Sequence, residues 1–263
     1  MNLHRIFALT KRHLYLYRRS LPRLMEIFYW PFLDLLVWGF VALYLTRYKE
    51  ALPAFITFLI GALILWDILF RSQQGIAVSF LEDVWSRNLL NLFTSPLKPS
   101  EYLATLMVVS IIKLLSASTV LVLLAWLIYS FNIFLIGLSL IPLVLNLVIM
   151  GWSIGIVTIS LIMRFGQETE VLAWGLAFLF QPVSAVFYPV SVLPPFLQTI
   201  ARFVPSSHVF EGMRAIIEGG AFPLNDLLWA AGLNGIYLTA ALLFFAWNFK
   251  VVKEKGLLAK EGE

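Results

Sequence analysis

Residues 134–163 read FLIGLSLIPLVLNLVIMGWSIGIVTISLIM, thirty residues without one charged side chain. A helix needs roughly 20 apolar residues to cross the hydrocarbon core of a bilayer, which is about 30 Å thick. This stretch therefore predicts a membrane-spanning helix. The whole chain agrees, because 60% of its 263 residues are hydrophobic and 13% are charged, which is more apolar surface than a soluble domain can bury. We expect an all-α integral membrane protein.

Six apolar stretches are long enough for membrane helices. Their approximate bounds are Ile27–Thr46, Ala51–Phe70, Leu103–Tyr129, Phe134–Met163, Val171–Val190 and Leu227–Trp247. With six crossings, the segments on one side hold fourteen Lys and Arg residues and those on the other side hold four. Because basic segments stay in the cytoplasm, we expect a multi-pass protein of the plasma membrane with both termini cytoplasmic.

The composition also excludes several kinds of chemistry. The chain has no cysteine, so disulfides and thiolate metal sites are absent. No histidine and glutamate spacing typical of a metal site occurs, and no glycine-rich phosphate loop that could hold ATP and Mg²⁺ is present. The basic residues gather in loops and near the termini, where lipid headgroups rather than nucleic acid are the expected partners. We expect no cofactor, metal or catalytic residue in this chain.

Residues 1–24 are predicted to form an amphipathic helix. The apolar residues recur at roughly helical spacing among basic ones; they are Leu3, Ile6, Phe7, Leu14 and Tyr17. Such a helix should lie in the inner headgroup plane, as a lipid anchor, as a contact for a cytoplasmic partner, or as both. Residues 25–263 are then expected to be a single six-helix transmembrane domain.

The connection after the second predicted span is too long and too patterned for a simple loop. Residues 80–93 carry apolar side chains at helical spacing, and Thr94, Ser95 and Pro96 end the pattern. A rigid cytoplasmic helix of this kind is suited to transmit force from a soluble partner. The alternative is a surface helix that only packs beneath the bundle.

A proline-rich segment over residues 182–220 is predicted on the outer side. Its prolines lie at positions 182, 189, 194, 195 and 205 and prevent one uninterrupted helix. Residues 196–203 and 206–218 remain helix-compatible. We expect a broken helix that dips back into the membrane, followed by two short helices, because irregular backbone is tolerated there only when protein covers it.

Polar residues inside the predicted spans are candidates for a substrate path, because charge within a membrane is costly. They are Asp34, Lys113 and Asn146. Asp34 and Lys113 could form an ion pair, contact substrate, or reach toward the interface. Asp67 and Arg71, four residues apart, are expected to form a local pair.

Two weaker patterns concern the packing and the shape of the helices. Gly151 and Gly155 have a spacing that permits close helix approach and that also arises by chance in membrane chains. Pro142 and Asn146 predict a kink in the fourth span.

Two other classes of protein stay open at this point. A membrane-embedded lipid-modifying enzyme would need a polar catalytic group, and residues 206–211 offer two serines, a histidine and a glutamate. These neighbours on one helix point in different directions, so helix capping by Ser206 or Ser207 is the better account. An ion-coupled carrier would need buried titratable residues in inverted repeats. Neither class explains the amphipathic cytoplasmic helix.

Two motifs carry a resemblance to a known family. One is RNLLNLFTSPL at residues 87–97 followed by Glu101, and the other is FYP at 187–189, LPP at 193–195, Pro205 and Arg214. In order and spacing they resemble the signatures of membrane subunits of type-2 ATP-binding-cassette (ABC-2) exporters, and the resemblance covers nearly the whole chain. Asn88 and Ala185 stand where that family often has glycine.

The resemblance implies a permease subunit that pairs with a second permease, as homodimer or heterodimer, and docks a separate ATPase that binds ATP and Mg²⁺. The residues implied to couple to the ATPase are Glu82, Asp83, Trp85, Arg87, Asn88, Leu89, Leu92, Arg164 and Glu168. Those implied to form an outer gate are Phe187, Tyr188, Pro189, Pro194, Pro205 and Arg214. Few charges lie within the spans, and their apolar walls include aromatic residues such as Trp38, Phe40, Trp152, Phe178 and Phe180. This composition favours an amphipathic or lipophilic substrate such as a drug-like molecule, lipid or lipid-linked glycan, with polysaccharide or O-antigen export as the alternative.

Overall fold

The computed structural model describes residues 1–18, 20–48 and 53–256. Within these ranges every regular element is a helix, so the prediction of an all-α chain is confirmed. The α-helices are α1 Leu3–Arg18, α2 Leu21–Tyr48, α3 Pro53–Trp85, α4 Leu89–Thr94, α5 Pro99–Tyr129, α6 Leu140–Phe165, α7 Leu172–Gly175, α8 Pro195–Ala201, α9 Pro205–Ile217 and α10 Leu224–Glu254. Short 3-10 helices are η1 Ile133–Ser139, η2 Gln167–Thr169, η3 Ala177–Leu179 and η4 Val190–Val192.

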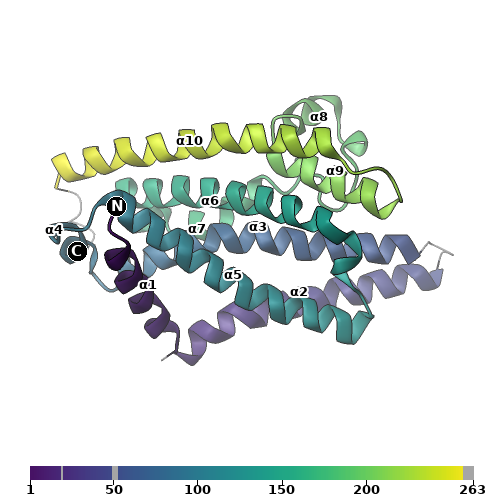
Figure 1. The fold of residues 1–263 in the computed structure, drawn as a ribbon, viewed down its shortest axis with the longest axis horizontal. Helices are drawn as coiled ribbons and strands as arrows, with labels where there is room; N and C mark the ends of the chain where they lie inside the picture. Colours follow the sequence, from purple (N-terminus) through teal and green to yellow (C-terminus); the bar gives the residue numbers. More distant parts are fainter. Residues whose placement is uncertain (19, 49–52, 257–263) are drawn as a thin grey trace.

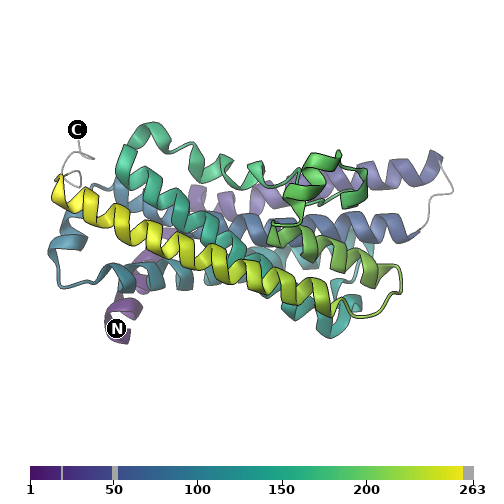
Figure 2. The same ribbon diagram turned by 90° about the horizontal axis from the view of Figure 1, so that it is seen from above.

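In the described part of the chain, five long helices form an elongated bundle. α3 packs against α5 on one side and α6 on the other, and α6 also packs against α10. Figures 1 and 2 show α1, α4 and the last turns of α10 together at one end of the bundle, which we call the α4 end. The short helices α8 and α9 lie toward the opposite end.

Three helices of the described residues are long and apolar enough to cross a membrane: Pro99–Tyr129, Ile136–Phe165 and Leu224–Glu254. They correspond to the third, fourth and sixth predicted spans. The 28 residues of α2 and the 33 of α3 have lengths of about 42 and 50 Å at 1.5 Å per residue. The predicted start of the second span at Ala51, and the basic residues Arg19 and Lys49, lie outside the described residues.

The fifth predicted span, Val171–Val190, is wrong as a continuous helix. The structure has only the short helices α7 and η3 there, followed by turns. Pro182 disfavours helical backbone at the residue before it and lacks an N–H group, and Ala185 adopts a left-handed φ of 53°. The chain therefore leaves the helical path in the middle of this apolar stretch.

Close contact between α3 and α6 confirms that Gly151 and Gly155 allow helix approach. A Cβ atom built on Gly151 would lie 2.5 Å from the carbonyl oxygen of Leu69, and one on Gly155 would lie 3.0 Å from that of Gln73. The kink predicted near Pro142 is displaced. η1 precedes α6, and Gly137 takes a φ of 65°, so the break lies before Pro142.

Candidate functional site

The helix predicted over residues 80–93 is two helices in the structure, so its predicted bounds are wrong. α3 continues to Trp85, and α4 begins at Leu89. Between them Arg87 has a left-handed φ of 51°. Its backbone N–H donates to Val84, and that of Asn88 donates to Asp83, which is the Schellman pattern that ends helices. The apolar pattern is continuous in sequence, but this turn redirects the chain.

Glu82 and Asp83, expected to face an ATPase, are buried against α1. Arg12 Nη1 lies 2.6 Å from Asp83 Oδ1, and Tyr102 OH donates to Asp83 Oδ2 at 2.9 Å. His13 is also buried, with Nε2 3.5 Å from Asp83 Oδ2 and Nδ1 3.9 Å from Glu82 Oε2. We call these five residues the α1-docking cluster. Here Glu82 and Asp83 contact α1 rather than an open surface.

The α1-docking cluster is charged. Burial lowers the pKa of His13, but the carboxylates of Asp83 and Glu82 outweigh burial and raise this pKa above its usual value of 6.5. Burial raises the pKa of Asp83, yet the close contact with His13 and the charge and hydrogen bond of Arg12 hold this pKa below 3.8. Each charge therefore stabilises the other.

Two further contacts fix α1 along its length. Glu101 Oε1 accepts from the backbone N–H of Asn2 at 2.7 Å. At the other end of α1, Lys113 Nζ donates to the hydroxyl of Tyr17 and, at 2.7 Å, to Ser79 Oγ. Lys113 is thus a buried anchor that joins α5, α1 and α3.

The buried face of α1 differs from the predicted apolar face. The residues that face the protein are Ile6, Leu9, Thr10, His13 and Tyr17. Leu3 and Phe7 are exposed. These two side chains are therefore available to lipid, while the neighbouring face is occupied by protein.

An open surface lies beside the turn between α3 and α4. Trp85 is 49% exposed, and its Nε1 donates to Glu170 Oε1 at 3.0 Å. Its ring stacks on that of Trp174, 6.4 Å between centroids. Arg87 and Glu168 are exposed too. The end of α3 and the loop after α6 therefore share one surface.

The other coupling residues lie deeper at the same end. Leu89 is buried and Leu92 is half-buried, while Asn88 precedes α4 without a side-chain cap bond. Arg164 Nη1 donates to Asn248 Oδ1 at 3.3 Å, and its guanidinium lies 4.8 Å from the Trp247 ring centroid. Arg164 therefore joins α6 to α10.

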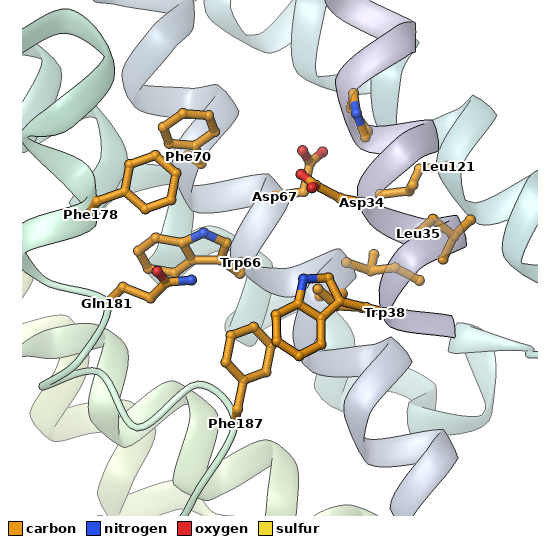
Figure 3. Close-up of a pocket in the computed structure, with 13 residues that line it drawn as sticks. Asp34, Leu35, Trp38, Trp66, Asp67, Phe70, Leu121, Phe178, Gln181 and Phe187 are labelled. Atoms are coloured by element: carbon orange, nitrogen blue, oxygen red, sulfur yellow. The ribbon is translucent and has the colours of Figure 1, made fainter. Parts of the chain in front are cut away.

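A cavity of about 280 Å³ lies between α2, α3, α5 and residues 178–187. Asp34 and Asp67 both line it, and Figure 3 shows their carboxylates at the same part of the space. Asp34 lies fourteen residues before the last residue of α2, and Asp67 lies fourteen residues after the first residue of α3. Because the two helices are joined at these ends, the two residues lie level with each other. Arg71 Nε lies 3.1 Å from Asp67 Oδ1, which confirms the expected local pair.

Aromatic rings form two walls of this cavity. Trp38 stacks on Phe187 with 5.1 Å between centroids. Phe70 lies 4.9 Å from Phe178, which in turn lies 6.1 Å from Trp66. In Figure 3 the two groups stand on different sides of the space that the carboxylates face. The proline-rich segment contributes Phe187, so it reaches the cavity.

The structure does not bring Asp34 and Lys113 together, so the ion-pair interpretation is wrong. Lys113 donates a hydrogen bond to Ser79. Ser79 is twelve residues further along α3 than Asp67, and Asp67 lies level with Asp34. This separation is about 18 Å along the helix. Asn146 is also elsewhere, because Asn234 Nδ2 donates to its Oδ1 and its carbonyl at 2.9 Å.

The proline-rich segment is fixed by contacts to α9. Arg214 Nη1 lies 2.6 Å from Glu211 Oε1, and its Nη2 donates to the carbonyl of Ala185 at 3.2 Å. Glu211 also accepts from the backbone N–H of Val190 at 2.8 Å. Tyr188 OH donates to the carbonyl of Pro182 at 2.8 Å. The remaining prolines set boundaries: Pro189 precedes η4, Pro194 precedes α8 and Pro205 opens α9.

The serine and histidine group on α9 does not form a catalytic arrangement. Ser207 Oγ donates to the carbonyl of Val204 at 2.8 Å, and Ser206 Oγ bonds Ser184 Oγ at 2.6 Å. His208 Nε2 lies 2.9 Å from the carbonyl of Arg202. Helix capping by these serines is also wrong, since the cap residue is Val204 and no side-chain cap bond occurs.

Sequence reasoning missed His13 as a buried residue. The spacing of Ile6, Leu9, His13 and Tyr17 is a helical stripe and could have indicated it. It also missed Ser79 as the partner of Lys113, for which the sequence holds no signal.

Two comparisons with known proteins found related sequences. A model of the ABC-2 family transporter proteins matches residues 40–248. The linearmycin resistance permease protein LnrN of Bacillus subtilis (strain 168) is 35% identical over 71 residues, which cover 27% of this chain and 17% of that protein. Permeases of this family are membrane proteins that normally work with an ATP-binding subunit. Since the family match takes in most of the bundle, the chain belongs to the ABC-2 family of transporter proteins.

Proposed function

We propose that this chain is the permease subunit of an ATP-driven exporter that moves an amphipathic or lipophilic molecule outward across the plasma membrane. Two permease subunits pair in the membrane, and a separate ATPase docks on each. With the broken stretch over residues 171–190 counted as the fifth of six passes, both termini lie in the cytoplasm in this proposal. The chain has no phosphate-loop motif, so the ATPase must supply the energy.

One observation carries the docking site. At the α4 end, Trp85 and Leu90 are 49% and 48% exposed beside the exposed Arg87. Exposed apolar side chains at a charged end are typical of a surface that a protein partner covers. The abundance of basic residues at this end favours its cytoplasmic location. Glu82 and Asp83 then act through α1, and the turn after α3 makes the direct contact.

The nature of the cargo is proposed from the cavity. Its walls are largely aromatic and aliphatic, which favours a lipophilic body over a fully polar sugar chain. The relative LnrN is named for linearmycin resistance. By likeness, we propose that this chain also removes a small lipophilic compound.

Co-purification tests the docking site. The full chain is expressed with a candidate ABC ATPase subunit and captured through a tag on the permease. Trp85→Ala and Arg87→Glu should reduce the captured ATPase at least about tenfold, because aromatic and arginine residues dominate protein contacts. Matched controls are Trp229→Ala and Arg202→Glu, since both are exposed at the other end, where Trp229 Nε1 donates to the carbonyl of Arg202.

Equal loss in the controls would contradict the docking site. Transport that proceeds in vesicles without ATP or ATPase would contradict the exporter and favour a carrier.

A further inference from the structure

The cavity combines a negative charge with aromatic walls. Among the described residues that line it, Asp34 and Asp67 are the charged ones. Arg71 neutralises Asp67 through the 3.1 Å contact. Asp34 is exposed and has no ion pair within the described part of the chain. One carboxylate therefore faces the cavity without a cation in contact with it.

We propose that this cavity binds an organic cation, a protonated amine or quaternary ammonium group on an apolar body, with Asp34 as its counter-charge. This inference rests on the proposed function, because it names the class of cargo at the proposed site. It also distinguishes between cargoes, since an anionic head group would be repelled.

The position of Asp34 on α2 indicates that its carboxylate has a function. Asp34 lies near the middle of the 28-residue helix α2 and inside the first predicted span, where an uncompensated charge is costly. Lys113, the one basic residue inside the predicted spans, is held by Ser79 about 18 Å away along α3. The charge of Arg71 acts on Asp34 but is held in the contact with Asp67, so a cation in direct contact with Asp34 would come from a ligand.

The aromatic rings fit the same ligand. Indole and phenyl faces attract cations that lie within about 6 Å of the ring centroid. Trp38 is one helical turn from Asp34 on α2, and its ring stacks on Phe187. Trp66 precedes Asp67 on α3 and also lines the cavity. A cation beside Asp34 would thus have ring faces from two helices around it.

The size of the space limits the ligand. About 280 Å³ lies near the lower end of small-molecule sites, which range from about 300 to 1,000 Å³. It suits a head group and an adjoining ring, while a long apolar tail would extend between helices.

Two probes of similar size and opposite charge test the inference. The full chain in lipid nanodiscs, without ATPase or ATP, is titrated with tetraphenylphosphonium and separately with tetraphenylborate, and binding to empty nanodiscs is subtracted. We expect specific binding of the phosphonium. Asp34→Asn should weaken it about tenfold or more, the usual effect of losing a charged contact. Asp226→Asn, at the start of α10, is the matched control and should leave it unchanged.

A second pair of variants tests the ring. Trp38→Phe keeps an aromatic face and should retain most of the phosphonium binding, whereas Trp38→Leu should lose it. The thermal unfolding midpoint of each variant shows that the fold is kept. Equal phosphonium affinity in Asp34→Asn and Asp226→Asn, or a wild-type preference for the borate, would overturn the inference.

The outcomes separate the two proposals. If the ATPase docks as proposed but phosphonium affinity is unchanged in Asp34→Asn, only the proposal of the cation site is refuted. If phosphonium binding depends on Asp34 but the ATPase does not bind, the exporter proposal fails and the cation site stands.

Discussion

Replacing Gly151 by alanine tests the packing that holds α3 against α6. The added Cβ would lie 2.5 Å from the carbonyl oxygen of Leu69, whereas ordinary van der Waals contact begins at 3.4 Å. The shortfall is about 0.9 Å, and both groups belong to helix backbones that cannot turn aside. Overpacking of this kind costs about 1–3 kcal/mol. The same change gains about 0.5–1 kcal/mol of helix propensity.

Two other glycines complete the experiment. Alanine at Gly155 would place Cβ 3.0 Å from the carbonyl of Gln73, so a smaller shift suffices. Gly232, in α10, has no atom within 4 Å of such a Cβ and should only gain propensity. Gly232→Ala should be the most stable of the three variants, Gly155→Ala should be intermediate, and Gly151→Ala should be the least stable.

Unfolding in mixed micelles of increasing sodium dodecyl sulfate measures this order on the full chain. The Gly232 and Gly151 variants share the propensity gain, so their difference isolates the overpacking cost, about 1–3 kcal/mol. Gly151→Ala as stable as Gly232→Ala would show that α3 and α6 do not approach as the structure has them.

Three further predictions concern other parts of the chain. The pKa of His13 is raised, so charged His13 stabilises the docking of α1 fully below pH 6.5, and this stabilisation is lost as the pH rises through the raised pKa. Spin-label distances between α1 and α5 should therefore lengthen as the pH rises in the wild type, but not in His13→Gln. Wild-type distances that do not change with pH would contradict this prediction. Asn234→Leu leaves Asn146 without its 2.9 Å partner and should lower the free energy of unfolding by about 1–3 kcal/mol, with an unchanged detergent-unfolding midpoint as the contrary result. Ala185→Gly removes a left-handed alanine at φ 53°, a strain of about 1–2 kcal/mol, and should raise the thermal midpoint, whereas a lower midpoint would speak against strain.

The length and charge of apolar stretches predicted the helices whose apolar pattern is uninterrupted. The same prediction failed where the backbone turns inside an apolar stretch. Leu103–Tyr129 has an uninterrupted pattern, and α5 ends at the predicted residue. Residues 171–190 are as apolar, yet Ala185 turns the chain by a left-handed backbone that no hydropathy pattern encodes. Arg87 ends α3 in the same way, without the glycine that usually indicates such an end.

The candidate site was predictable in its residue types and less so in its partners. Asp34 and Lys113 were recognisable as costly charges inside predicted spans, but their partners depend on which helices lie level with each other. Ser79 and Tyr17 reach Lys113 because α1 folds back along α3 and α5. The sequence does not show which residues of different helices lie at the same level, so it could not exclude the ion pair between Asp34 and Lys113.

α3 connects the α4 end to the cavity as one rigid element. Asp67 and Asp83 are sixteen residues apart on a helix without an internal proline or break, about 24 Å at the α-helical rise. Close contact at Gly151 holds α3 to α6, so a force applied near Trp85 moves the Asp67 wall of the cavity together with α6. The opposite wall is different, because Pro31 interrupts the hydrogen-bond ladder of α2 one turn before Asp34. Opening of the cavity should therefore occur by bending of α2 at Pro31 against a rigid α3, which would move Asp34 away from Asp67 and release a bound cation.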